Sequence, residues 1–244
     1  MKKLKRNALF KEKNEIRNFL MKTDNEMNLM KYEEAVVFDD RTFCDYYISL
    51  IRTHQILIFA IHTKNDYNSR IIKICYFFFI YAFTFIINLL FIDDSTLYFI
   101  RIKDSFFESI KFYFEKIIYA TLISYLLKVI LSSLIFSENI FLSIKSKIYF
   151  RKKRIIGNFG MKYVAYFGSV IISLLFFIYY NMCFFAVFPN IQIFALEISG
   201  ISFVFILLIP MVINIFPCIF RIYSLRPRKD REMSYRFSQF LQLI

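Results

Sequence analysis

The stretch Tyr163 to Phe188 reads YVAYFGSVIISLLFFIYYNMCFFAVF and carries no charged residue over its 26 positions. A helix needs about 17–25 predominantly apolar residues to cross the roughly 30 Å hydrocarbon core of a bilayer. This stretch is long enough to cross the core with some tilt. It predicts a membrane-spanning helix and so decides the class of the protein.

Three further apolar runs have a comparable length: Ile74 to Ile92, Ile117 to Phe136, and Ile198 to Phe220. Of the 244 residues, 58% are hydrophobic, and the mean hydropathy is +0.49. Soluble domains are usually about 45–50% apolar. We therefore predict an all-α, multi-pass membrane protein with about four transmembrane helices and an amphipathic helix on the cytosolic side.

The formal net charge of +13 would suggest nucleic-acid binding in a soluble protein. Here Lys and Arg outnumber Asp and Glu by 14 to 10 in residues 1–73, by 7 to 1 in 137–162 and by 6 to 2 in 221–244. The intervening loops 93–116 and 189–197 carry no basic excess. Cytosolic loops are expected to be basic, so both termini and the middle loop are predicted to be cytosolic, without a nucleic-acid partner.

The sequence predicts four successive parts of the chain. A charged cytosolic segment covers 1–42 and begins, from Met1 to Lys13, without the roughly 7–15-residue apolar run of a signal peptide. An amphipathic helix and a turn cover 43–70. The four-helix transmembrane module covers 71–222, and a basic cytosolic tail that can bind anionic lipids covers 223–244.

The amphipathic helix is predicted from Phe43 to Ile61, where apolar residues recur at steps of three and four. Asp45, Arg52 and His54 lie within this segment and make it a poor membrane span. We expect it to lie at the membrane interface.

Lys128 is the one ionisable residue clearly inside a predicted span. Thr121, Ser124, Lys128 and Ser132 follow one another at steps of three and four, which places them on one helix face, expected to turn inward. The lysine either reaches toward the cytosolic interface along its flexible stem or serves as a substrate counter-ion or pore-lining charge.

The other spans carry weaker polar stripes, which include Asn88, Ser173, Asn181 and Asn214. Such residues commonly join membrane helices through close packing and interhelical hydrogen bonds, and we favour this role over a transport path. Transporters usually show repeats or broken helices near the midplane, and no repeat is visible in the sequence. Pro210 predicts a kink in the fourth span because it frees the carbonyl of Ile206.

The sequence contains no recognisable catalytic constellation. Its two histidines both precede the first span, its four cysteines show no CxxC spacing, and it has no GxGxxG or GKS/T loop. We predict no enzyme activity, cofactor or metal. Cys75 and Cys218 lie near the predicted cytosolic membrane edges and are either sites of reversible palmitoylation or small buried apolar residues.

Asp93, Asp94, Ser95 and Thr96 follow the first span. Two neighbouring carboxylates could attract a cation. A helix N-cap followed by a short amphipathic helix on the outer side explains the same residues, and we prefer that interpretation.

Several stretches together resemble a membrane module of predicted ciliate transmembrane proteins. They are RTFCDYYISLIRTHQILIFAIHTKNDYNSRIIKI (Arg41 to Ile74), LLFIDDSTLYFI (Leu89 to Ile100), YATLIS (Tyr119 to Ser124) and ISFVFILLIPMVINIFPCIFRIYSLR (Ile201 to Arg226). In that family the module often follows a large cysteine-rich or repeat ectodomain. This chain lacks the ectodomain, which suggests a free-standing or truncated copy, and it has Glu197-Ile198 where the family usually has Lys-Asp. The resemblance implies fold and topology, and no catalytic residue.

Three functional hypotheses follow. The first is a non-enzymatic module that acts as anchor, scaffold or subunit of a membrane assembly, with lipid and other membrane subunits or further copies of itself as partners. The second is a channel or transporter subunit whose path is lined by Lys128 and by Asn88, Asn181 and Asn214. The third is a lineage-specific accessory subunit of an organellar complex.

Overall fold

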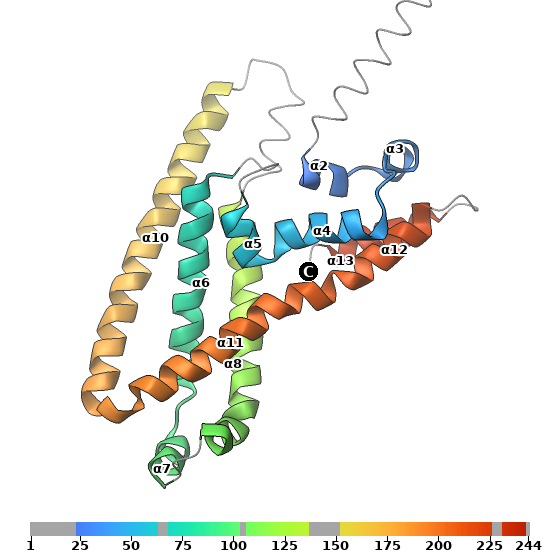
Figure 1. Cartoon of the computed structure of the whole chain (residues 1–244). Helices are drawn as coiled ribbons and strands as arrows, with labels where there is room; N and C mark the ends of the chain where they lie inside the picture. The colour runs from blue at the N-terminus through green and yellow to red at the C-terminus, as the bar shows by residue number, and fades with distance from the viewer. Residues whose placement is uncertain (1–22, 63–67, 103–105, 137–151, 226–230, 243–244) are drawn as a thin grey trace, which may run out of the picture. The chain divides into compact units, whose positions relative to one another are not determined.

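The computed structural model describes residues 23–62, 68–102, 106–136, 152–225 and 231–242. All regular structure in these ranges is helical, as predicted (Figure 1). The helices form two compact units: residues up to Tyr67 together with Pro210–Ile244 make the first, and Asn68–Ile209 make the second. The boundary between the units therefore passes through a helix at Pro210.

The second unit is built on long apolar helices. Figure 1 shows α6 descending, α8 ascending beside it, and α10 flanking α6. The elements are α6 (Arg70–Leu90), α7 (Asp94–Ile102), α8 (Phe106–Ile135), α10 (Lys152–Val187), the short 3-10 helix η2 (Pro189–Ile191) and α11 (Gln192–Ile213), which leaves the unit after Ile209.

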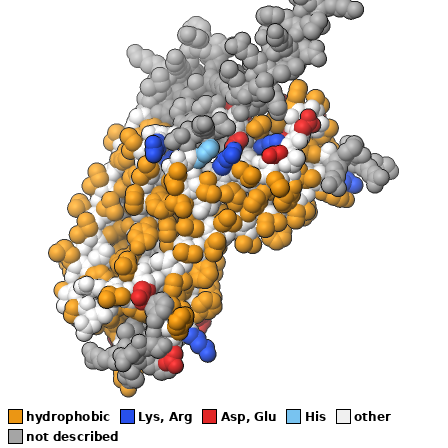
Figure 2. Space-filling model, viewed as in Figure 1, with side chains coloured by type: hydrophobic (Ala, Val, Ile, Leu, Met, Phe, Trp, Pro, Cys, Tyr) orange, Lys and Arg blue, Asp and Glu red, His pale blue; other side chains and the backbone are white. Residues whose placement is uncertain are grey.

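Aromatic rings hold α6 against α10. Phe83 meets Phe79 and Phe177 edge to face, with ring centroids 4.7 Å and 4.9 Å apart. Aromatic pairs favour this T-shaped arrangement because the positive ring edge meets the negative face. The outward side of α10 carries exposed apolar residues from Met161 to Val187, and Figure 2 shows a mostly hydrophobic surface over this part of the helix.

Three helical segments are long and apolar enough to cross a membrane: Arg70–Leu90, Gly160–Val187 and Pro189–Leu225. The predicted span 117–136 covers the last part of α8 and one residue beyond it; α8 is 30 residues long but is not among these three. Hydropathy in the described residues thus supports a membrane protein with three candidate spans, and the fourth span stays a prediction.

The predicted fourth run, 198–220, differs from the structure at its ends. α11 begins at Gln192, continues through Pro210 and ends at Ile213, and α12 (Ile215–Leu225) follows after Asn214. The interruption lies one turn before Pro217, which has no N–H to donate to the carbonyl four residues earlier. A kink at Pro210 itself stays a prediction.

The first unit combines short helices from both ends of the described chain. Thr23 and Glu26 form a capping box at the start of its first helix, and Thr42 and Asp45 form another at the start of α4. The helices are α2 (Asp24–Asn28), α3 (Tyr32–Phe38), α4 (Phe43–His54), α5 (Ile56–Ile61), α12 and α13 (Glu232–Leu241).

The predicted helix 43–61 is interrupted at Gln55, whose backbone is extended and whose side chain caps α5 through the N–H of Ile58. Although α4 is amphipathic as predicted, its apolar side is covered by the protein, because Tyr46 and Leu50 pack against Cys218 of α12. The interruption also shifts the phase of the pattern, so that Ile61 is exposed. The hydrophobic pattern of α4 therefore does not require lipid to explain it.

The segment around α3 packs against α13 at the other end of the chain. Met30 and Ala35 form a buried cluster with Tyr235 of α13. The Tyr235 hydroxyl donates to the Met30 carbonyl at 2.7 Å, and the Gln239 amide donates to the same oxygen at 2.8 Å. The first unit therefore combines the two ends of the chain, whereas the sequence predicts a division into successive segments.

Candidate functional site

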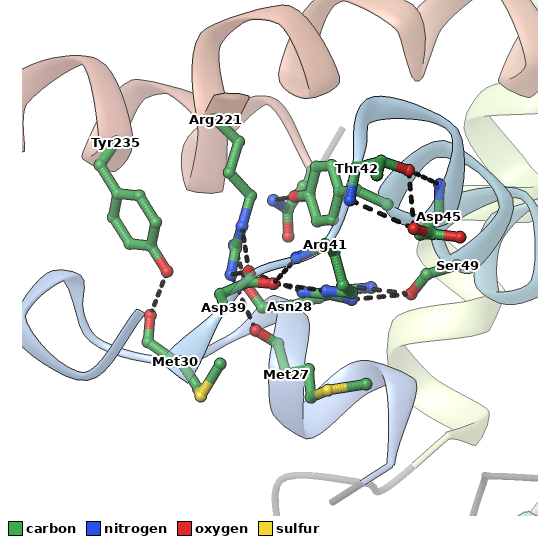
Figure 3. A network of polar contacts seen from close by, with 12 residues as sticks. Met27, Asn28, Met30, Asp39, Arg41, Thr42, Asp45, Ser49, Arg221 and Tyr235 are labelled. Atoms are coloured by element: carbon green, nitrogen blue, oxygen red, sulfur yellow. Dashed lines mark hydrogen bonds and ion pairs between the residues drawn. The ribbon is translucent and has the colours of Figure 1, made fainter. Parts of the chain in front are cut away.

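A fully buried arginine lies at the centre of the first unit (Figure 3). Arg221 of α12 has 0% of its surface exposed, and its guanidinium bonds to two segments that precede α4. Nε and Nη2 donate to Asp39 Oδ2 at 3.0 Å and 2.6 Å. Nη1 donates to the Asn28 carbonyl at 2.8 Å, and Nη2 donates to the Met27 carbonyl at 2.9 Å. Arg221 thus satisfies carbonyls at the end of α2 as well as a carboxylate.

A second arginine binds the same carboxylate. Arg41 Nε donates to Asp39 Oδ1 at 2.7 Å, and Nη2 donates to Oδ2 at 2.9 Å, which is the paired geometry that suits a guanidinium and a carboxylate. Arg41 Nη1 also donates to Asn28 Oδ1 at 2.9 Å, an oxygen that accepts a further bond from Ser49 of α4. We call Asn28, Asp39, Arg41 and Arg221 the arginine cluster.

Aromatic rings cover the two guanidiniums. The Tyr46 ring centroid lies 4.7 Å from Arg221 Cζ and 5.0 Å from Arg41 Cζ, and the Tyr235 centroid lies 4.9 Å from Arg221 Cζ. Such contacts favour the cations because the ring face is negative. The Tyr46 hydroxyl also accepts a bond from the Gln242 side chain.

The charges of the cluster shift the ionisation of its members. Burial by itself raises the pKa of Asp39, but the hydrogen bonds and charges of Arg41 and Arg221 outweigh it and hold this pKa below its ordinary value. Burial raises the pKa of Tyr46 well above its ordinary value, although both arginines partly oppose the shift. Asp39 is therefore ionised and Tyr46 neutral at neutral pH, which leaves the group a pair of cations and one anion.

This arrangement is suited to holding segments together. Every guanidinium nitrogen of Arg221 has a partner within the protein, and the side chain is inaccessible. Sequence reasoning counted Arg221 only among the basic residues that flank the last span. The available signal was helical spacing: Asn214, Cys218 and Arg221 follow at steps of four and three, so they share one face of the helix.

The predicted polar residues of the second unit join its helices. Asn88 of α6 is fully buried and accepts a hydrogen bond from Ser202 of α11 at 3.0 Å, while its amide donates to the Thr84 carbonyl at 2.8 Å. The Tyr113 hydroxyl of α8 donates to the Asn88 carbonyl at 2.9 Å. Asn88 thus connects α6, α8 and α11.

Lys128 is buried, and the face to which it belongs turns inward. Thr121 and Ser124 are buried on the same face of α8. The Lys128 carbonyl accepts a bond from the Tyr76 hydroxyl of α6 at 2.7 Å, and its Nζ lies 5.0 Å from the centroid of the Tyr125 ring. Ser124 Oγ is buried without a hydrogen-bond partner among the described residues.

The remaining polar candidates are not gathered into one site. Ser132 bonds the carbonyl of Val129 in its own helix. Ser173 and Asn181 are half-buried in α10, and Asn181 Oδ1 has no partner among the described residues. Asn214 belongs to the first unit, where its Oδ1 lies 3.0 Å from His54 Nδ1.

Asp93 caps the helix that follows it, as expected from the sequence. Its Oδ1 accepts bonds from the Thr96 backbone at 3.0 Å and from the Ser95 hydroxyl at 2.8 Å, and α7 begins at the next residue. Lys116 of α8 pairs with the same oxygen at 2.6 Å. These contacts, led by that with Lys116, hold the pKa of Asp93 below its ordinary value. The Asp93 carboxylate therefore binds Lys116 and the first turn of α7.

The described cysteine, histidine and carboxylate side chains do not form a metal site. No group of three His, Cys, Asp or Glu side chains in the described ranges could hold a metal ion. Cys218 is fully buried beside Tyr46, so its thiol is inaccessible, which favours a small buried apolar residue over a palmitoylation site. Cys75 is half-buried and stays a candidate for that modification.

Comparison with models of protein families gave no match, and neither did comparison with curated proteins or with solved structures. Any function therefore has to be argued from the contacts described above.

Proposed function

We propose that the protein is a non-enzymatic, four-span membrane module that serves as an anchor, scaffold or accessory subunit of a membrane assembly. α6, α8, α10 and α11 are the proposed spans. The contact between Asp39 and Arg221 carries the topological part of this proposal.

Asp39 precedes α6, and Arg221 follows α11. Because the two side chains are bonded to each other, the segments that carry them lie on the same side of any membrane that the chain crosses. The number of crossings between them is then even. Three apolar candidates alone give an odd number, and a crossing by α8 brings the number to four.

The shared side is proposed to be the cytosol. The basic excess lies in residues 1–73, 137–162 and 221–244, which precede or follow the apolar parts of the four helices, and basic flanks favour this orientation. The same basic segments are proposed to attract anionic lipid headgroups.

The scaffold role is supported by how the intramembrane polar groups are used. Ser202 and Tyr113 each bond to Asn88 across helices, as residues do when they hold a membrane bundle together. In contrast, α10 leaves most of its apolar surface uncovered. This surface suits lipid and further membrane subunits as neighbours.

Glycosylation mapping in microsomes tests the fourth span directly. One variant carries an added N-glycosylation acceptor between α7 and α8, and a second carries it between α8 and α10. We expect modification of the first variant only. Equal behaviour of the two variants would show that α8 does not cross the membrane and would refute the four-span topology.

Native gel electrophoresis after mild detergent extraction tests the assembly role. We expect a particle larger than one 29.6 kDa chain with its detergent. A strictly monomeric particle would contradict a role as scaffold or subunit and would leave only that of an anchor.

One observation favours the channel or transporter alternative. Lys128 is a buried ionisable residue within α8, and the neighbouring Ser124 hydroxyl is buried without a partner among the described residues. Ionisable residues inside a membrane bundle often line a path for substrate or ions.

A further inference from the structure

The two C-terminal helices turn several large apolar side chains away from the protein. On its inward side α13 buries Tyr235 and Ser238. On its other side it leaves Met233 88% exposed and Phe240 58% exposed, beside the exposed ion pair of Arg236 with Glu232. Surface helices in water usually turn their large apolar residues inward.

α12 has a similar exposed side. Its buried side holds Cys218, Arg221 and Ser224, whereas Ile219 and Tyr223 are exposed. Phe220 connects the two helices, because its ring meets that of Phe237 in α13 edge to face with centroids 5.0 Å apart. Both helices therefore turn large apolar side chains outward.

The outward side forms one surface. Phe220, Met233, Phe237 and Phe240 line a shallow groove of about 570 Å³, together with Ser234 and Arg236. We call these four apolar residues the outer face of the α12–α13 hairpin. A solvent-exposed apolar surface of this kind marks a site of interaction with a membrane or another protein.

The position of the hairpin in the chain favours lipid. The apolar segment Pro189–Leu225 has 37 residues, about 55 Å of helix, whereas the hydrocarbon core is only about 30 Å thick. Its last part carries the ion pair of Arg221 with Asp39, and charged groups favour a position outside the hydrocarbon. Five residues after Leu225, α13 returns along α12. The outer face thus follows a proposed span directly in the chain.

We propose that the α12–α13 hairpin lies in the plane of the membrane interface, with its outer face inserted among the lipid acyl chains. Arg236 at the edge of the groove then reaches the headgroup phosphates, as basic residues do on interfacial helices. This inference rests on the proposed membrane function, and it names the lipid bilayer as the partner of a surface outside the spans.

The chain contains no tryptophan, so a single added tryptophan reports its own environment. The full chain is reconstituted in vesicles of phosphatidylcholine, with or without bromine on the acyl chains. The variants are Phe237→Trp and Phe240→Trp on the outer face. Val204→Trp in α11 is the control inside a proposed span, and Val37→Trp, at an exposed position of α3, is the control outside the outer face.

We expect brominated lipid to reduce the emission of Phe237→Trp and Phe240→Trp to an extent comparable to Val204→Trp. Acrylamide in the water should quench Val37→Trp strongly and the outer-face variants weakly. Two outer-face positions are used so that one poorly folded variant does not decide the result.

The inference would be overturned if acrylamide quenched the emission of both outer-face variants and brominated lipid did not. Protection from both quenchers would also overturn it, since a second copy or another protein would then cover the face. If Val204→Trp is also insensitive to brominated lipid, the proposed membrane function fails as well. The two failures are thereby distinguished.

Discussion

Asp39 and Arg221 are 182 residues apart in the chain, and their side chains meet at 2.6 Å in the interior of the first unit. Asp39 is also bonded to Arg41, so two guanidiniums share one carboxylate. This asymmetry makes the carboxylate the most sensitive member of the arginine cluster.

Replacing Asp39 with Asn should destabilise the first unit by about 3–5 kcal/mol, because it leaves the buried cation of Arg221 and the half-buried cation of Arg41 without an anion. Hydrogen exchange of residues 24–38 in the detergent-solubilised protein measures the effect. Asp40→Asn is the matched control, since Asp40 is the next residue and its side chain is exposed. Equal exchange in the two variants would contradict the central role of Asp39.

The first unit should lose stability in acid. The pKa of Asp39 is below its ordinary value of 3.8 in the folded state, so its ionised form contributes stability above the unfolded-state pKa. That contribution is lost as the pH falls through the lower folded-state pKa. Cleavage of residues 24–38 by pepsin should rise steeply below about pH 4. Asp39→Asn should flatten this pH dependence, and an unchanged profile would assign the transition to other groups.

Asn88 and Ser202 should be energetically coupled. Interhelical hydrogen bonds in membranes are worth about 0.6 kcal/mol on average and up to about 1.7 kcal/mol, so Asn88→Leu and Ser202→Ala should each cost this order and should not add. Unfolding in mixed detergents gives the double-mutant cycle. Ser199→Ala is the control, because Ser199 is equally buried but bonds the Ala195 carbonyl of its own helix. If Asn88 and Ser199 showed a coupling energy as large as that of Asn88 and Ser202, the hydrogen bond between Asn88 and Ser202 would not explain the coupling.

Lys128→Leu separates the scaffold from the channel. A central lysine costs roughly 2.5–3.5 kcal/mol in membrane insertion, so for a scaffold the replacement should leave stability unchanged or higher. Ion flux into reconstituted liposomes should stay at background for both proteins. Flux through the wild type that Lys128→Leu abolishes would favour the channel alternative.

The cysteines should differ sharply in reactivity. Cys44 is exposed and should react with a maleimide in the folded protein, whereas buried Cys218 should react only after unfolding. Mass spectrometry after timed labelling measures both rates. Rapid labelling of Cys218 under native conditions would mean that its packing against Tyr46 opens readily.

The sequence contains clear local signals for most of the fold. The apolar run 163–188 indicates α10, and the Asp93 to Thr96 pattern predicts the start of α7, because hydropathy and capping depend on neighbours in the chain. The interruption at Gln55 was missed, since a glutamine in an apolar helix pattern carries no strong stop signal.

The arginine cluster could not be predicted, because the composition of 221–244 equally fits the basic flank of a span. Its pairing depends on which distant segments meet, and a single sequence does not state that. Likewise, the polar stripe containing Asn88 indicated a helix contact without naming Ser202 as the partner. The burial of Lys128 follows from the face predicted for α8, but the use of that lysine does not.

The discontinuity of the first unit also sets an order in time. At about 5–20 residues per second, Arg221 is synthesised about 10–40 seconds after Asp39. During that interval all four proposed spans have to enter the membrane. Asp39 and Arg41 then lack α12, the helix that carries Arg221. If one span failed to insert, Arg221 would emerge on the opposite side and the first unit could not close. Its closure therefore reports that the chain between Asp39 and Arg221 has crossed the membrane an even number of times.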